Sequence, residues 1–422
     1  MLKRIIPQSS YARNVLTLMT GTSIAQAIPI AISPILTRIY SPEEFGVFAL
    51  YMALVSILSV LVTGRYELAI LIPKRDRDAI NIVALSVSLT ILISSALLLF
   101  FALFNSKIIQ LLGMNGSGYW LYVVPASTLV MGFYQSLNYW NNRQSQYKRM
   151  AISRTANSGT ASLVQLSLGY AGTGTSGLVG GQLAGVGLAI TVLMRMIWRE
   201  DRDRIKTIKI NRMVALAKKY INFPKFLIFA HGFNTASGQM PVLLLGSFFT
   251  VTASGFYGLT QRVLGAPMTL IASAMGDVFR QEASKAYAYN GNCTLIYKKT
   301  FKRLLLISFA PFLIFFFVAP GLFSLVFGQQ WQIAGVYAQI LTPMFFLKFI
   351  TSPLSSMFII AQKQRLDLIW QICLLVMIIS SFFLGHVMSS VYAALTAFSS
   401  VYCLMYTVNG FVSYQLALGR WK

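Results

Sequence analysis

Acidic residues are scarce in this sequence: 11 Asp and Glu stand against 35 Lys and Arg, which gives a formal net charge of +24. Charged residues of both signs make up only 11% of the 422 residues, whereas 56% are hydrophobic. An average soluble domain carries about 25% charged residues. This shortage of charge excludes a conventional water-soluble domain and indicates a polytopic membrane protein.

Histidine and cysteine are also rare, with two and three residues. Neither forms a cluster at metal-ligand spacing, so we expect no metal site. The odd cysteine count predicts no disulfide framework, and we expect Cys293, Cys373 and Cys403 to be small hydrophobic side chains. The sequence lacks a Walker A motif, which argues against ATP hydrolysis, and we expect no cofactor.

Long apolar windows recur along the whole chain. About twenty such residues cross about 30 Å of hydrocarbon as a helix. The windows predict twelve transmembrane helices, with 155–172 the least apolar, centred near Ile28, Ala53, Ile91, Leu129, Ser162, Val186, Gly238, Gly265, Phe315, Phe346, Val376 and Tyr402.

The positive charge follows a topology. With the N-terminus placed in the cytoplasm, all but four of the 35 Lys and Arg fall in cytoplasmic segments, as the positive-inside rule requires. Arg38 and Lys107 lie outside, and Arg262 and Lys348 lie within spans. We therefore expect a multi-pass protein with both termini in the cytoplasm. Because the charge is spread over seven segments, it does not indicate a nucleic-acid partner.

The longest interior connection, REDRDRIKTIKINRMVALAKKYINFPKF, follows six spans and precedes six more. It predicts a six-helix lobe at 1–198, a basic cytoplasmic linker at 199–223 and a second six-helix lobe at 224–422. Apolar residues alternate with lysines in the linker, which fits an amphipathic helix on the inner leaflet or a solvated loop equally. The expected fold class is all-α, with two pseudo-symmetric lobes.

A weak internal repeat favours duplication of the lobes. A Gln and a Pro precede an aromatic-Gly pair by about twenty residues in both halves: Gln26 and Pro29 before Phe45 and Gly46, and Gln239 and Pro241 before Tyr257 and Gly258.

Two cations are expected deep in the membrane. Arg262 lies about 15 Å along its span, and Lys348 is also close to mid-depth. Such a charge is disfavoured by about 2.5–3.5 kcal/mol unless it has a partner, and no Asp or Glu is expected at mid-depth in any span. Either an anionic ligand supplies the partner, or carbonyls, tyrosines and Gln261 solvate the cations in a structural role.

Other polar residues near the spans have two readings each. His231 is either a lining or proton-relay residue or a hydrogen-bonded core histidine. Arg65 and Glu67 form either a cytoplasmic gate or a structural ion pair. Asp277 and Glu67 are candidates for coupling transport to an ion gradient. The sequence does not select between protons and sodium as the coupling ion. The longest external loop, 105–118, carries one charge, which disfavours a glycan polymerase or ligase.

Residues 36–86 contain SPEEFG before the second span, RYELAILIPK after it and DAINIVALS at the start of the third. This region resembles Wzx-type O-antigen and polysaccharide repeat-unit flippases of the multidrug/oligosaccharidyl-lipid/polysaccharide (MOP) exporter superfamily, which includes the MATE exporters. The resemblance implies two six-helix lobes around a cationic cavity that opens alternately to each side. It also implies a non-enzymatic protein of the bacterial inner membrane.

The same resemblance implies a substrate and partners. The substrate would be an undecaprenyl-diphosphate-linked oligosaccharide of O-antigen and lipopolysaccharide or a related polysaccharide, and its surroundings would be membrane lipids and the polymerase and chain-length proteins of the glycan pathway. Arg262 and Lys348 match the expected cavity cations by position, although the quoted motifs do not extend to them.

Two departures bear on other members of the superfamily. Lipid II flippases have fourteen spans and a charged first helix, whereas residues 14–37 contain no charge. Drug exporters often use a membrane-embedded carboxylate, which is not expected here. A drug or small-cation antiporter stays the alternative, and a glycosyltransferase or polymerase ranks third.

Overall fold

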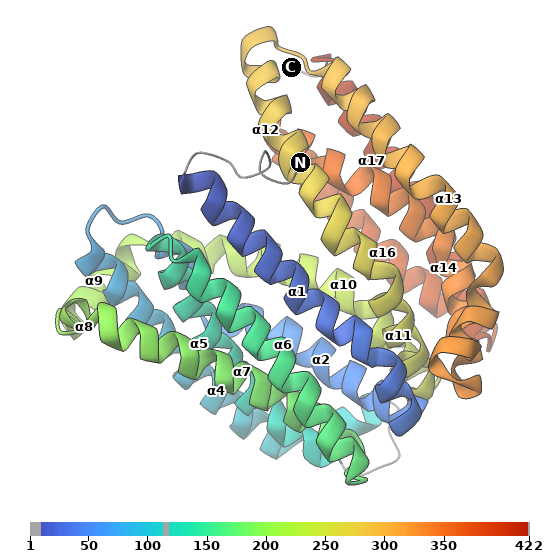
Figure 1. The fold of residues 1–422 in the computed structure, drawn as a ribbon, viewed down its shortest axis with the longest axis horizontal. Helices are drawn as coiled ribbons and strands as arrows, with labels where there is room; N and C mark the ends of the chain where they lie inside the picture. Colours follow the sequence, from blue (N-terminus) through green and yellow to red (C-terminus); the bar gives the residue numbers. More distant parts are fainter. Residues whose placement is uncertain (1–9, 113–117, 421–422) are drawn as a thin grey trace, which may run out of the picture. The chain divides into compact units, whose positions relative to one another are not determined.

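The computed structural model describes residues 10–112 and 118–420, in which helices are the only regular secondary structure (Figure 1). These residues form two compact units. The first unit comprises the described part of Met1–Tyr40 together with Leu50–Gln239, and the second comprises Ser41–Ala49 and the described part of Met240–Lys422. The predicted six-helix lobes, 1–198 and 224–422, and their origin by duplication stay predictions.

The first unit contains α1 to α9 and the start of α10. Their bounds are α1 Ser10–Ile39, α2 Pro42–Val62, whose first residues belong to the second unit, α3 Tyr66–Ala69, α4 Asp76–Leu111, α5 Val123–Arg143, α6 Tyr147–Tyr170, α7 Thr175–Glu200, α8 Arg202–Ile205, α9 Ile210–Lys219 and α10 Ile228–Phe248. A 3-10 turn, Gly118–Tyr122, precedes α5, and a π-helical turn, Phe223–Leu227, precedes α10.

The second unit contains the remaining helices. Their bounds are α11 Val251–Pro267, α12 Ser273–Asn290, α13 Thr294–Phe327, α14 Gln332–Thr351, α15 Met357–Ile360, α16 Gln364–Val387 and α17 Val391–Ala417. A π-helical turn, Met268–Ala272, joins α11 to α12, and 3-10 turns at Gln329–Trp331 and Ser352–Ser356 flank α14.

Eight helical segments of the described residues are long and apolar enough to cross a membrane: Met19–Ile39, Pro42–Val62, Asp76–Leu111, Thr175–Glu200, Thr294–Phe327, Gln329–Ile360, Gln364–Val387 and Val391–Ala417. All twelve predicted centres lie inside helices. Those near Leu129, Ser162, Gly238 and Gly265 lie in α5, α6, α10 and α11, which are not among the eight. The chain is an all-α, multi-pass membrane protein.

The polar composition of α6 has a packing reason. Figure 1 shows α6 beside α1 and α7, and its polar side chains bond to these neighbours. The Gln165 amide donates to the Leu178 carbonyl of α7 at 3.1 Å, while the Tyr40 hydroxyl, just after α1, donates to the Gln165 carbonyl at 2.7 Å. Polar groups that bond between helices need not face lipid.

The start of α2 is held by a capping box. In the sequence SPEE, the Ser41 backbone N–H donates to the Glu44 carboxylate at 2.7 Å, and the Glu44 N–H donates to the Ser41 hydroxyl at 3.3 Å. Pro42 occupies the first helical position, where its missing N–H costs no hydrogen bond. Each side chain therefore satisfies a donor that the helix itself leaves free.

Two glycines bring α2 and α11 into close contact in the second unit. A β-carbon on Gly255 would lie 2.0 Å from the Pro42 carbonyl oxygen, and one on Gly46 would lie 2.0 Å from the Val251 carbonyl oxygen. Beside this contact the Phe45 and Trp331 rings meet edge to face at 5.0 Å. Only glycine permits the two backbones to approach so closely.

Candidate functional site

Arg262 lies on α11, whose start is capped by the Thr250 hydroxyl, which accepts a hydrogen bond from the Ala253 N–H at 3.1 Å. Its side chain is half-buried. Within residues 10–112 and 118–420, Arg262 makes neither a hydrogen bond nor an ion pair. Among the described residues no hydrogen bond joins Arg262 to the neighbouring Gln261, whose amide N–H donates to the Tyr257 hydroxyl at 2.9 Å. The guanidinium is thus available to an external anion.

Lys348 lies near the end of α14 and is also half-buried. Its ammonium group lies 5.9 Å from the ring centroids of both Phe345 and Tyr402. Ring faces attract a cation electrostatically, by about 0.5–2 kcal/mol. No ion pair of Lys348 occurs in the part of the chain that the structure describes. The aromatic rings therefore compensate Lys348 in part, whereas Arg262 has no such contact with the residues that the structure describes.

The two cations lie at different levels of the second unit. The Thr260 hydroxyl of α11 donates to the Ala334 carbonyl of α14 at 2.8 Å, and further along Gly276 faces Pro353, so the two helical segments run parallel. Arg262 follows the first contact by two residues and Lys348 by fourteen. At 1.5 Å per residue, their α-carbons are about 18 Å apart along the helices.

Three predicted site residues meet in the first unit. Arg65 Nη1 lies 3.0 Å from Glu67 Oε1, and Arg65 Nη2 contacts His231 Nδ1. His231 was not predicted to join this ion pair, but the structure brings the three residues together; we call them the Arg65 cluster. Because arginine can only donate, Nδ1 accepts and the ring is neutral in this arrangement.

The Arg65 cluster carries backbone strain and a buried charge. Arg65 has φ 58°, in the left-handed region that non-glycine residues rarely occupy. The Glu67 side chain is only 1% exposed. Burial raises the pKa of the Glu67 carboxyl and outweighs the lowering by Thr63 and Arg65. Strain and a desolvated carboxyl are both features that concentrate at functional sites.

Asp277 lies apart from these groups, on the exposed side of α12. It lines a cavity of about 380 Å³ in the second unit, together with Arg280 and Asp367. Arg280 Nε donates to the Ser356 hydroxyl at 3.4 Å, and the Gln371 amide donates to Asp367 at 2.9 Å. The described residues contain no group of three or more His, Cys, Asp or Glu placed to hold a metal ion.

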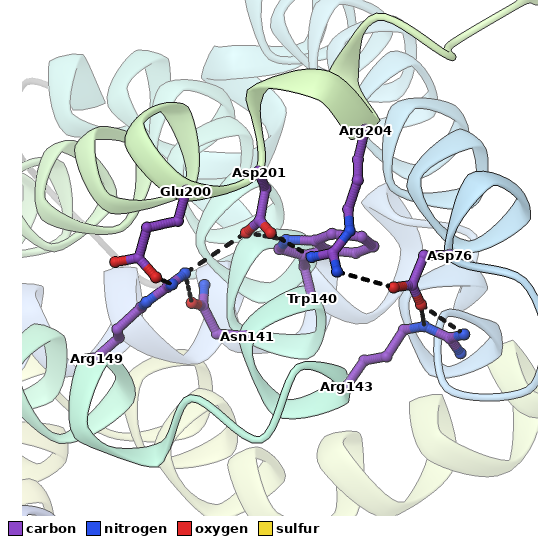
Figure 2. Close-up of polar contacts among 8 residues, drawn as sticks. All are labelled: Asp76, Trp140, Asn141, Arg143, Arg149, Glu200, Asp201 and Arg204. Atoms are coloured by element: carbon purple, nitrogen blue, oxygen red, sulfur yellow. Dashed lines mark hydrogen bonds and ion pairs between the residues drawn. The ribbon is translucent and has the colours of Figure 1, made fainter.

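An ion-pair network that was not predicted from the sequence lies in the first unit (Figure 2). Asp76, at the start of α4, lies 3.0 Å from Arg143 Nη2 at the end of α5 and 3.2 Å from Arg204 of α8. Arg204 also pairs with Asp201, which follows α7. The signal in the sequence was the run REDRD, where acidic residues interrupt a basic segment.

The buried half of this network centres on Arg149 and Asp201, whose side chains are 7% and 5% exposed. Arg149 Nη1 lies 3.5 Å from Asp201 Oδ2, and Arg149 Nη2 pairs with Glu200 (Figure 2). The Trp140 indole N–H donates to Asp201 Oδ2 at 3.2 Å. Three carboxylates thus balance three guanidinium groups and link the ends of α4, α5, α6 and α7.

Comparisons with known proteins agree with this architecture. Residues 35–336 match the model of a family described as "Polysaccharide biosynthesis protein". The comparison with curated proteins gave no match. Several solved structures are similar over nearly the whole chain.

One is a lipid II flippase, MurJ, in an inward closed conformation, with a TM-score of 0.75 and 13% identity, covering 96% of this chain and 90% of the other. A multidrug resistance MATE family transporter in an inward-facing conformation gives a TM-score of 0.73, 14% identity and coverage of 96% and 95%. A MOP superfamily transporter from Pyrococcus furiosus gives a TM-score of 0.66 and 15% identity, covering 97% of both chains. These likenesses establish a MOP-superfamily fold.

Proposed function

Because the chain belongs to the polysaccharide biosynthesis protein family, we propose that this MOP-superfamily membrane transporter flips an undecaprenyl-diphosphate-linked oligosaccharide, of O-antigen or a related polysaccharide, from the inner to the outer leaflet of the bacterial plasma membrane. The family match supports a glycan pathway, and the fold supports transport by alternating access. The proposed process involves no covalent chemistry and no resident cofactor.

Arg262 carries the proposal. It is a half-buried guanidinium on a helix of the membrane domain, without a counter-anion among the described residues. A cation at such a position is disfavoured by about 2.5–3.5 kcal/mol, and a bound diphosphate removes this cost through charge-assisted, bidentate hydrogen bonds. The ligand that best fits an unpaired guanidinium in a membrane protein of a glycan pathway is a lipid-linked diphosphate.

Lys348 supplies a second position for the same anion. Its α-carbon lies about 18 Å further along the helices than that of Arg262, and the proposed path brings the diphosphate to the two cations in succession. The aromatic rings beside Lys348 compensate the ammonium between substrates. Gln261, beside Arg262, is the proposed polar group for the sugars.

Substrate binding also provides a reason for a conformational switch. A ligand shifts an equilibrium only by its difference in affinity for the two states. An inward state that holds the diphosphate against Arg262 is favoured when the ligand is present and disfavoured when the site is empty. The Arg65 cluster is the proposed gate on the cytoplasmic side, where both termini also lie, and Glu67 and Asp277 are the proposed coupling residues for a proton or sodium gradient.

A drug or small-cation antiporter is the second candidate, since multidrug MATE transporters share the fold. Binding of a cationic drug would require an anionic site. The sequence predicts two cations, and no carboxylate, deep within the spans. This charge pattern favours the anionic substrate.

The proposal is tested in a strain that lacks this gene and any redundant flippase. The strain is complemented at matched protein levels with wild type, Arg262→Gln, Arg262→Lys or Arg303→Gln. Arg303 is an exposed residue of α13, so its substitution removes the same charge from a surface position. Surface glycan and lipid-linked repeat units on the cytoplasmic face are measured together.

We expect the deletion strain to lose surface glycan and to accumulate the lipid-linked unit. Arg262→Gln is expected to lower the rate of display about ten-fold or more, because a hydrogen bond to a charged group contributes about 1.5–3 kcal/mol. Arg262→Lys restores part of the rate and Arg303→Gln all of it. Full rescue by Arg262→Gln would refute the site, whereas unchanged glycan in the deletion strain, with new sensitivity to cationic drugs, would favour the antiporter.

A further inference from the structure

Helix α9 of the linker is docked on the start of α4. The Asn81 side chain donates to the Thr207 carbonyl at 3.2 Å and accepts from the Lys209 N–H at 2.9 Å, while Arg212 pairs with Asp78. Met213 and Leu216 of α9 are buried. The linker segment 210–219 is therefore an ordered helix that packs on the membrane domain.

An apolar groove of about 470 Å³ lies between the two helices. Leu85, Leu89 and Leu92 of α4 form one wall, and Met213 and Val214 of α9 form the other. The lining includes a single charged side chain, that of Lys218. The groove has the character of a hydrocarbon-binding site with one cation at its edge.

The groove lies where α4 enters the hydrocarbon. Charged residues end at Asp78 and begin again at Lys107, so the apolar stretch between them spans about 42 Å, against about 30 Å of hydrocarbon. The membrane boundary at this end therefore falls within about eight residues of Asp78. Leu85 to Leu92 lie at this boundary or just inside it, where a lipid headgroup meets its acyl chains.

The groove is open to its surroundings. Leu92 is 66% exposed and Val214 50% exposed, and Ile221, which also lines the groove, is 52% exposed. At the depth of the headgroups and first acyl carbons, such side chains face lipid. The occupant that matches this environment is one acyl chain rather than a peptide.

The cations around the groove differ in their contacts. Arg212 is paired with Asp78, Lys206 lies 3.0 Å from Asp203, and the Lys219 ammonium lies over the Tyr220 ring at 5.5 Å. Lys218 has no ion pair in the described ranges and lines the groove. Its ammonium is the group available to a phosphate at the mouth of the groove.

We propose that the groove between α4 and α9 is a binding site for an anionic phospholipid, with one acyl chain between the helices and the headgroup phosphate on Lys218. The apolar walls fit the chain, and the charge of Lys218 fits the phosphate of a lipid that carries a net negative charge. Bound lipid completes the packing of α9 on α4. The site is independent of the proposed substrate.

The test uses full-length protein in phosphatidylcholine vesicles that contain a minor share of phosphatidylglycerol. In one arm the phosphatidylglycerol carries a photoreactive acyl chain, and in the other an equal amount of phosphatidylcholine carries it. After irradiation, peptides covering 85–92 and 210–221 are analysed by mass spectrometry. Labelling of the exposed face of α13, which contains Leu306 and Ile314, serves as the bilayer reference.

We expect phosphatidylglycerol to label the groove peptides about five-fold more than phosphatidylcholine, relative to α13, since one lysine near an anionic lipid contributes a factor of this size. Lys218→Gln should abolish this preference. The matched control Lys219→Gln, one residue away, should keep it. Val214→Phe, which fills part of the groove, should lower the labelling by both lipids without changing that of α13.

Three outcomes would overturn the proposal. Equal labelling by the two lipids would make the groove an ordinary lipid-facing surface. An equal loss of preference in Lys218→Gln and Lys219→Gln would indicate a diffuse basic surface rather than a site. Stronger labelling by a photoreactive undecaprenyl diphosphate than by phosphatidylglycerol would assign the groove to the transported lipid.

Discussion

The ion pair between Arg149 and Asp201 provides a quantitative test of how the first unit is held together. Both side chains are almost fully buried. Arg149 Nη1 also donates to a neutral group, Asn141 Oδ1, at 3.4 Å. Asp201→Asn removes the charge but keeps an oxygen for the Trp140 indole. Arg149→Gln removes the opposite charge.

The expected loss of unfolding free energy follows from the burial of the Arg149 and Asp201 side chains. Loss of one partner of a buried ion pair costs about 3–5 kcal/mol when the other charge is left uncompensated. Arg149 keeps Glu200, whose side chain is 60% exposed and therefore screened by solvent. We accordingly expect each single variant to lose about 2–3 kcal/mol and the two substitutions to couple by about 2 kcal/mol, within the range for partners in one network.

The assay is a double-mutant cycle on equilibrium unfolding in mixed micelles, followed by tryptophan fluorescence. The matched control is the exposed pair of Lys206 and Asp203 in the same segment, whose side chains are 68% and 94% exposed. Exposed pairs contribute little, so this cycle should show no measurable coupling. A coupling for Arg149 and Asp201 no larger than that of the control would refute the reasoning.

Three further predictions concern other parts of the chain. Because burial raises the pKa of Glu67, the unfolding free energy of wild type relative to Glu67→Gln should decrease as the pH rises above about 4.5, and a pH-independent difference would contradict this. Gly255→Ala should destabilise by about 1–3 kcal/mol through its clash with the Pro42 carbonyl, whereas Gly265→Ala on the same helix, with open space beside it, should not; equal melting temperatures would refute the contact. Lys348→Gln should lower glycan display less than Arg262→Gln, since aromatic rings already compensate Lys348; the reverse order would make Lys348 the principal ligand.

Several features could be predicted from the sequence because they depend on neighbouring residues. The apolar windows located all twelve predicted centres in helices, since the cost of exposing a peptide group to hydrocarbon acts on each segment separately. The capping box at the start of α2 involves only neighbouring residues of SPEE, although it was not among the predictions. Eight segments meet the criterion for crossing. Helices α5, α6, α10 and α11 do not, and the twelve predicted spans include them, with the segment 155–172 of α6 supported by the alternation of charge.

The contacts of the candidate residues could not be predicted in the same way. His231 meets Arg65 across 166 positions, and Arg149 meets Asp201 across 52. The sequence showed a basic linker with an apolar alternation, and it left open whether that segment is an amphipathic helix on the inner leaflet or a solvated loop. The structure decides this through Met213 and Leu216, which are buried beside α4.

The sequence by itself determined that the protein is an all-α, multi-pass membrane protein, and it predicted two cations in the spans that have no carboxylate partner there. Those properties follow from hydropathy and charge, which add along the chain. Only the tertiary structure decided that Lys348 lies against aromatic rings while Arg262 does not, and that the two lie about 18 Å apart along their helices. The physical reason is that a side chain's partner depends on the rotation and register of packed helices, which residues distant in the sequence set together.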